Sequence, residues 1–155
     1  MSDSLFAADE QAMESLGAAI GQAMGFRGVI YLDGDLGAGK TTLSRGLIRA
    51  LGHRGAVKSP TFTLVEPYEL EAGTIYHFDL YRLLDPEELE FLGIRDYFAP
   101  ESLCLIEWPE KGAGILPSSD LTITIAAEGE GRRLHLAGHS AQGQAACRQL
   151  RDKQE

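Results

Sequence analysis

The chain has 155 residues, 44% of them hydrophobic, and a formal net charge of −9. This is a usual length for one domain, so we expect a single domain over residues 1–155, with its core over about 9–137 and a polar C-terminal tail over 138–155. The acidic net charge argues against a protein that binds nucleic acid strongly by itself. The sequence has no signal-peptide pattern and no long apolar run, which predicts a cytoplasmic protein with no membrane contact.

The first predicted elements are a helix and a strand. Residues 9–24 carry apolar residues at helical spacing, and Asp9 is a suitable N-cap residue. Residues 29–32 form a short apolar run that is typical of a buried strand.

A glycine-rich loop follows this strand. Residues 34–41 fit the pattern G-x-x-x-x-G-K-[ST]. Glycines allow successive backbone N–H groups to surround a phosphate, and the next helix adds its positive N-terminal end. Lys40 is expected to reach the β- and γ-phosphates, and Thr41 to offer its hydroxyl to Mg²⁺. The alternative interpretation is a glycine-rich turn with an exposed lysine.

The segment after the loop is predicted to be helical up to Gly52 and is rich in basic residues. Five basic residues and no acidic residue occur between residues 40 and 65: Lys40, Arg45, Arg49, Arg54 and Lys58. Arg45 and Arg49 share a helix face because they are four positions apart. This face is either solvated or a docking surface for an acidic partner or RNA.

Several strands are predicted in the rest of the chain. Residues 63–65 and 74–78 are expected to be strands, with a turn that contains Pro67 and Gly73 between them. Residues 103–106 predict a buried strand, and residues 121–126 and 132–136 a further pair.

Helix signals and the two cysteines complete the pattern. A helix is expected to start at Asp85, with Pro86 at the first helical position and Glu88 at the third, and the last residues form a polar helix. Cys104 and Cys147 fit neither a disulfide framework nor a metal motif, so we expect buried or spectator thiols. The order of elements predicts a single α/β domain in three layers, of the phosphate-loop nucleotidase type, with a mostly parallel sheet and antiparallel additions.

Two acidic residues end apolar runs. Asp79 follows residues 75–78, and Glu107 follows residues 103–106. Ligands of α/β sheets bind at the carboxyl ends of the strands, so either carboxylate could hold Mg²⁺ directly or through water.

Four ordered motifs give the chain a family resemblance. They are Gly34–Thr42, Ser59–Val65, His77–Arg82 and Ile106–Glu110. Over about residues 9–125 the chain resembles the TsaE family, small bacterial ATPases of the tRNA threonylcarbamoyladenosine pathway. The resemblance implies ATP and Mg²⁺ as cofactors, TsaB and TsaD as partners, and tRNA reached indirectly through their complex. ATP hydrolysis would then drive a cycle that supports formation of N6-threonylcarbamoyladenosine.

The resemblance also implies residue roles. The loop residues that wrap the phosphates would be Gly37, Ala38, Gly39, Lys40, Thr41 and Thr42, with Lys40 neutralising phosphate charge. Thr41 and Glu107 would contact Mg²⁺. Asp79 would lie near the γ-phosphate, where it could orient the attacking water or bind the metal through water. An ion pair between Asp79 and Arg82 is the alternative.

Further roles are expected around the nucleotide. Residues 59–62 would sense the γ-phosphate as a switch, or form a static turn. Trp108 would pack against the nucleotide, meet a partner or fill the core. His77 would fill the sheet surface or orient Asp79. Glu10, in the stretch 9–11, would touch adenine through its backbone, and Arg132 would contact a phosphate or the base.

Two other functions use the same loop. A small-molecule kinase would need a cationic lid, and the sequence has no obvious arginine-rich insertion. A nucleotide-dependent interaction module would bind without significant hydrolysis. A guanine-nucleotide switch is disfavoured because the chain has no asparagine and therefore no N-K-x-D motif.

Overall fold

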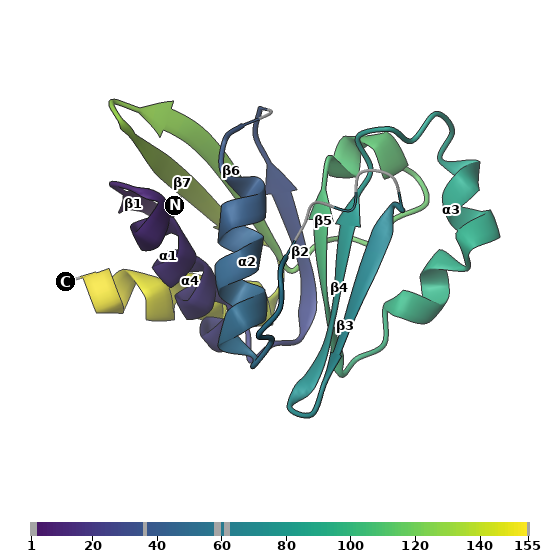
Figure 1. The fold of residues 1–155 in the computed structure, drawn as a ribbon, viewed down its shortest axis with the longest axis horizontal. Coiled ribbons are helices and arrows are strands. Elements are labelled where there is room, and N and C mark those ends of the chain that lie inside the picture. Colours follow the sequence, from purple (N-terminus) through teal and green to yellow (C-terminus); the bar gives the residue numbers. More distant parts are fainter. Residues whose placement is uncertain (1–2, 36, 58–59, 61–62, 155) are drawn as a thin grey trace.

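The computed structural model describes residues 3–35, 37–57, 60 and 63–154, which fold around one seven-stranded sheet (Figure 1). The strands are β1 (Asp3–Ala7), β2 (Gly28–Asp33), β3 (Val65–Leu70), β4 (Gly73–Asp79), β5 (Ser102–Glu107), β6 (Leu121–Glu128) and β7 (Gly131–Gly138). The α-helices are α1 (Glu10–Ala23), α2 (Lys40–Ala50), α3 (Glu87–Leu92) and α4 (Ala141–Gln154), and the short 3₁₀ helices are η1 (Ile94–Tyr97) and η2 (Pro109–Gly112).

The sheet has a parallel centre and antiparallel margins. Its order is β1-β7-β6-β2-β5-β4-β3, and the neighbouring strands β6, β2, β5 and β4 run parallel. At the margins, β7 and β1 pair antiparallel beyond β6, and β3 pairs antiparallel with β4. The carboxyl ends of the four central strands therefore meet at one edge, as expected for a ligand-binding α/β sheet. This confirms the predicted single-domain α/β fold.

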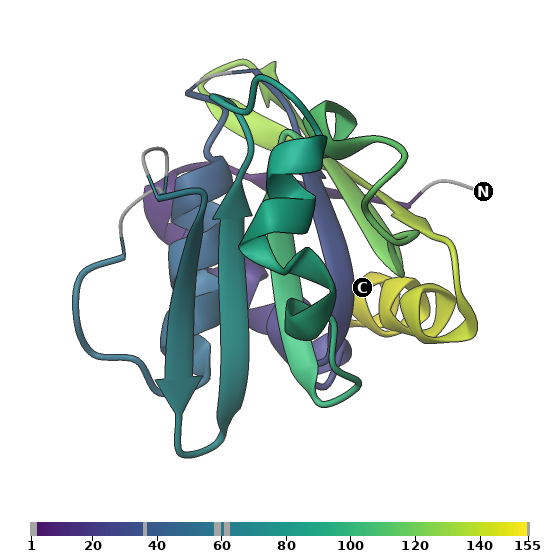
Figure 2. The same cartoon turned by 90° about the vertical axis from the view of Figure 1, so that its right-hand side faces the viewer.

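Alternating residues of the central strands separate two cores. Leu103 and Leu105 of β5 belong to the core under α1, α2 and α4, whereas Cys104 and Ile106 face a second core under α3 and η1. Figure 2 shows α3 in front of the central strands and α2 behind them. Because successive strand residues point to opposite faces, an almost continuous apolar run indicates a strand covered on both sides. The result is the predicted three-layer arrangement.

Helices α1 and α2 approach so closely that two positions accept only glycine. A Cβ on Gly17 would lie 2.1 Å from the carbonyl oxygen of Leu43, and one on Gly46 would lie 2.0 Å from that of Glu14. The predicted cap of α1 is confirmed, because Asp9 Oδ1 accepts from the backbone N–H of Ala12 at 2.8 Å. Of the described helices, none has both the length and the apolar composition that a membrane crossing needs.

The structure corrects the prediction for residues 63–70. The strand over 63–65 is wrong, since β3 covers Val65–Leu70 and includes Pro67, which pairs with Tyr76. Proline usually indicates a turn, yet β3 is an edge strand, where the missing N–H can face outward without breaking the hydrogen-bond ladder.

The packed core also extends beyond residues 9–137. Leu5 and Ala7 of β1 are buried, and so are Ala146, Cys147 and Leu150 of α4. The expected polar tail thus contains the amphipathic helix α4, whose apolar face packs on β7 and α1. Both cysteines are buried free thiols, as expected.

Candidate phosphate-binding site

The glycine-rich loop joins β2 to α2 and has the backbone that its glycines were expected to supply. Gly34, Gly37 and Gly39 have φ values of 149°, 80° and 106°, a region that other residues rarely adopt. Gly39 is the N-cap residue of α2, which begins at Lys40. Leu36 lies outside the described residues. The N-terminal end of α2 therefore faces the carboxyl edge of the sheet.

A cavity of about 490 Å³ lies at this edge. It is lined by Gly37, Gly39, Lys40, Thr41, Thr42, Asp79, Tyr81, Arg82, Glu107 and Trp108. The two predicted carboxylates meet there because Asp79 ends β4, Glu107 ends β5, and the parallel register pairs them directly. The structure thus brings the loop, Asp79, Glu107 and Trp108 together.

Lys40 is buried inside this site although it carries a charge. Its Nζ donates to the carbonyl oxygen of Gly34 at 2.7 Å and lies 3.7 Å from the centre of the Trp108 ring. Desolvation lowers the pKa of the Lys40 ammonium below its ordinary value, while the carboxylates of Glu107 and Asp79 act in the opposite direction. The acidic neighbours favour a charged lysine that can turn toward an anion.

Glu107 is held by His77. The Nε2 atom of His77 lies 2.6 Å from Glu107 Oε2, and both side chains are buried. Nδ1 of His77 has no hydrogen-bond partner among the described residues. We assign the proton to Nε2, because that tautomer leaves only an acceptor unpaired at Nδ1 rather than a buried N–H donor. His77 is thus buried in the sheet, which agrees with one of its two expected roles, and its polar contact is with Glu107 instead of the expected Asp79.

Asp79 is buried and locally fixed. Its Oδ1 accepts from the backbone N–H of Tyr81 at 3.0 Å, and the backbone N–H of Leu80 donates to the carbonyl oxygen of Glu107 at 3.1 Å. The first bond fixes the Asp79 side chain at the end of β4, and the second ties the ends of β4 and β5 together beyond the last strand pair. Arg82 lines the same cavity, so the ion pair with Asp79 stays an alternative.

Trp108 adopts a left-handed backbone conformation with φ 58° directly after β5. Such strain in a non-glycine residue is concentrated at functional sites. The half-buried indole packs against Tyr81, with ring centres 5.0 Å apart, and forms the wall behind Lys40. Of its three expected roles, packing at the nucleotide site is the one that this placement favours.

The donor set fits Mg²⁺ bound together with phosphates. Thr41 and Glu107 line one cavity, and the described residues contain no group of three or more His, Cys, Asp or Glu side chains that could enclose a metal. Mg²⁺ usually takes one or two protein oxygens and completes its shell with phosphate and water oxygens.

A smaller cavity of about 270 Å³ adjoins the loop on its other side. It is lined by Glu10 and Arg132 together with Gly37, Ala38 and Thr42, so the two residues predicted to contact the nucleotide lie beside the loop. Arg132 Nε also donates to the carbonyl oxygen of Ala38 at 3.2 Å. Arg132 therefore supports the loop from β7, a contact between distant segments for which the sequence carries no signal.

The basic face of α2 is largely occupied within the chain. Arg45 forms ion pairs with Glu10 at 3.1 Å and Glu14 at 2.5 Å, and Arg49 lies 3.8 Å from Glu14. Of the two alternatives, a docking surface for an acidic partner is not supported at Arg45, whose charge serves the contact with α1. Lys58, and Ser59, Thr61 and Phe62 of the expected switch, lie outside the described residues.

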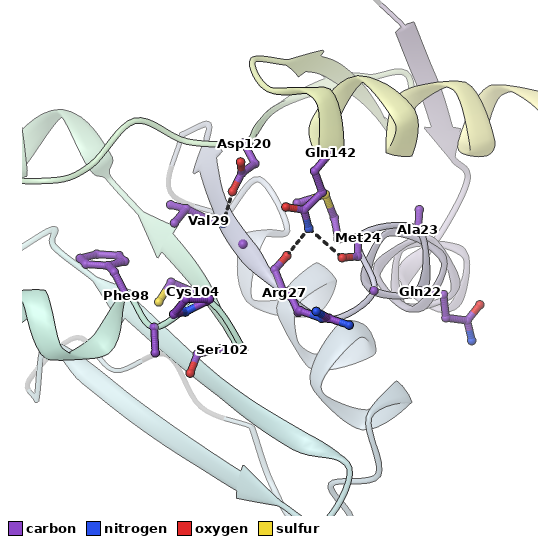
Figure 3. Close-up of a pocket in the computed structure, with 14 residues that line it drawn as sticks. Gln22, Ala23, Met24, Arg27, Val29, Phe98, Ser102, Cys104, Asp120 and Gln142 are labelled. Carbon is purple, nitrogen blue, oxygen red and sulfur yellow. Dashed lines mark hydrogen bonds between the residues drawn. The ribbon is translucent and has the colours of Figure 1, made fainter.

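A third cavity, about 650 Å³, lies at the opposite edge of the sheet near the start of β2 and β5 (Figure 3). Gln142 of α4 donates there to the carbonyl oxygens of Met24 and Arg27 at 2.9 and 2.8 Å. Asp120 accepts from the backbone N–H of Val29 at 2.8 Å. These contacts fasten α4 and the start of β6 to the rest of the fold, so Asp120 and Gln142 of this larger cavity have structural partners.

The fold and the site together define a single-domain α/β protein with a glycine-rich loop between a central parallel strand and its helix. The model of the family "Threonylcarbamoyl adenosine biosynthesis protein TsaE" matches residues 7–134. The chain therefore belongs to the TsaE family, which takes part in tRNA threonylcarbamoyladenosine biosynthesis.

Curated relatives and a solved structure agree with this assignment. A TsaE protein of Haemophilus influenzae is 58% identical over 115 residues, which cover 74% of this chain and 73% of the relative. A TsaE protein of Bacillus subtilis is 42% identical over 105 residues, covering 68% and 65%. The crystal structure of Bacillus subtilis YdiB matches with a TM-score of 0.82 and 26% identity, covering 100% of this chain and 97% of that chain.

Proposed function

We propose that the protein binds Mg-ATP in the 490 Å³ cavity and hydrolyses it weakly by itself, as a cytoplasmic subunit that supports threonylcarbamoyladenosine formation with TsaB and TsaD. The supporting observation is the convergence of Lys40 and Thr41 from α2, Asp79 from β4 and Glu107 from β5 on this one cavity. These are the residue types that phosphoryl transfer requires: a phosphate-binding lysine, metal-binding oxygens and a carboxylate near the attacking water.

Each residue of the site has a distinct task. Lys40 leaves the Gly34 carbonyl and neutralises charge on the β- and γ-phosphates, while the backbone N–H groups of the loop surround them. Thr41 and Glu107 would hold Mg²⁺, which when bound withdraws charge from the phosphate oxygens. Asp79 accepts a hydrogen bond from the attacking water and orients it.

His77 acts behind this site as a positioning residue. By donating to Oε2 of Glu107 it fixes the orientation of the carboxylate, which would hold Mg²⁺ together with Thr41. The buried pair therefore sets the direction of the metal-binding carboxylate.

ATP turnover, with and without TsaB, TsaD and tRNA, tests the proposal. We expect slow phosphate release by the chain alone and faster release with the partners. Hydrolysis that needs a small-molecule phosphate acceptor would indicate a kinase instead. Nucleotide binding with no phosphate release under any of these conditions would indicate an interaction module.

A further inference from the structure

Two large apolar side chains are almost completely exposed in one short segment. Leu84 is 94% exposed and Phe91 is 89% exposed. Single exposed apolar residues are common, but two side chains this open within eight residues of chain are unusual. We call residues 84–91 the acidic apolar segment.

The exposure of these side chains is a fixed feature of the folded chain. Leu83, Leu89 and Ile94 anchor the segment and its flanks in the second core. Glu88 Oε2 accepts from the backbone N–H groups of Leu84 and Asp85 at 2.9 and 3.0 Å, and Asp85 Oδ1 accepts from that of Glu87 at 2.9 Å. The turn before α3 is therefore held in a conformation that presents Leu84 outward.

The segment is joined directly to the candidate nucleotide site. It begins two residues after Arg82, which lines the cavity with Asp79 and Tyr81. Leu83 donates its backbone N–H to Leu80, and Trp108 packs against the same core as Leu83 and Leu89. Residues 84–91 are therefore continuous with the lining of the cavity, both along the chain and through the second core.

The charge of the segment selects one kind of occupant. Residues 84–91 contain Asp85, Glu87, Glu88 and Glu90 and no basic residue, although Glu90 forms an ion pair with Arg95, outside the segment, at 3.3 Å. Nucleic acid, an anionic membrane surface and a second copy of this chain, with its net charge of −9, would all be repelled. A basic protein surface with an apolar pocket is complementary in both respects.

We propose that the acidic apolar segment docks a partner protein, with Leu84 and Phe91 entering an apolar pocket whose rim carries lysine and arginine. That this partner belongs to the threonylcarbamoyladenosine machinery rests on the proposed function. A preordered segment costs less conformational entropy on binding, which suits the fixed turn before α3.

Binding of the ATP-loaded chain to an immobilised TsaB–TsaD complex, measured by biolayer interferometry, tests the docking. Leu84→Ser/Phe91→Ser should weaken binding by about tenfold or more, as expected for central apolar anchors. Glu87→Lys should weaken it by about fivefold at low salt, and the difference should shrink at high salt. Both variants should keep the thermal midpoint and the ATP affinity of the wild type, since neither changes the nucleotide site.

Matched controls lie elsewhere on the surface. Phe6→Ser removes a partly exposed aromatic from β1, which lies on the opposite side of the fold from α3 (Figure 1). Glu71→Lys reverses an exposed charge in the turn between β3 and β4. Both should bind like the wild type. If the double serine variant binds as tightly as the wild type, the docking segment is wrong and the proposed function stands. If the wild-type chain does not bind the complex at all, both the proposed partners and the docking segment are wrong.

Discussion

At the scale of single residues, the site depends on charges that the fold keeps close together in a buried place. Lys40 lies between a carbonyl oxygen and an indole ring, and Glu107 is fixed by a histidine. Buried charges are costly unless they are paired, so such groupings persist where chemistry uses them.

Lys40→Ala should reduce ATP turnover about 100-fold or more, because the substitution removes the ammonium that the loop holds for the phosphate charge. Turnover and calorimetric ATP affinity measure the effect. Lys111→Ala is the matched control, since Lys111 is exposed on η2 and does not line the cavity. Unchanged turnover in Lys40→Ala would remove the loop from the mechanism.

His77→Leu should raise the Mg²⁺ concentration needed for ATP binding about tenfold, since it leaves Glu107 without its donor. The emission of Trp108, the sole tryptophan, can report binding at each Mg²⁺ concentration. His77→Gln should restore part of the metal response because its amide can donate in place of Nε2. A purely structural His77 would lower the thermal midpoint in both variants and leave the Mg²⁺ dependence unchanged.

Cys104 should resist alkylation in the folded protein. Burial raises the pKa of its thiol to about 12, so the reactive thiolate is absent at about pH 8 and forms only as the pH rises toward that value. Peptide mass spectrometry after iodoacetamide treatment should find Cys104 modified in denaturant and unmodified without it. Rapid native-state labelling would contradict the assigned burial.

At the scale of elements, the contact between α1 and α2 positions the loop. Gly17 and Gly46 permit the close approach, and Arg45 joins the same helices through Glu10 and Glu14. The basic stretch that resembled a docking surface in the sequence thus has an internal role at Arg45. Reversing the charge of Arg45 would disturb the contact between α1 and α2 as well as any contact with a partner.

Gly46→Ala should lower the free energy of unfolding by about 1–3 kcal/mol, because the new methyl group meets the backbone of α1 and forces the helices apart. The higher helix propensity of alanine offsets only part of this. Urea unfolding measures the change. Gly55→Ala, where a Cβ would meet only the side chain of His53, should have a much smaller effect, and equal effects would show that close helix packing is not the cause.

At the scale of the whole molecule, the preference for adenine or guanine nucleotides depends on which base-recognition motif the chain contains. It contains no asparagine, so the N-K-x-D guanine motif is absent. In a competition titration, ATP should bind as tightly as GTP or more tightly. GTP binding tighter by about tenfold, roughly 1.4 kcal/mol, would defeat the proposed ATPase.

The sequence by itself determined the local elements and the glycine backbone of the loop between β2 and α2. Residues 9–24, 29–32 and 103–106 were predicted correctly because helical spacing and apolar runs act over a few neighbouring positions. The meeting of Asp79 and Glu107 was also foreseeable, since both end strands of a parallel sheet.

Only the tertiary structure decided which distant residues meet. Three features join segments that are far apart in the chain: the pairing of β1 with β7, the burial of α4 and the bond from His77 to Glu107. A fourth, the strand that includes Pro67, depends on its place at the edge of the sheet. Local sequence patterns carry no information on such pairings, because their free energy comes from burial and hydrogen bonds that exist only after the sheet has formed.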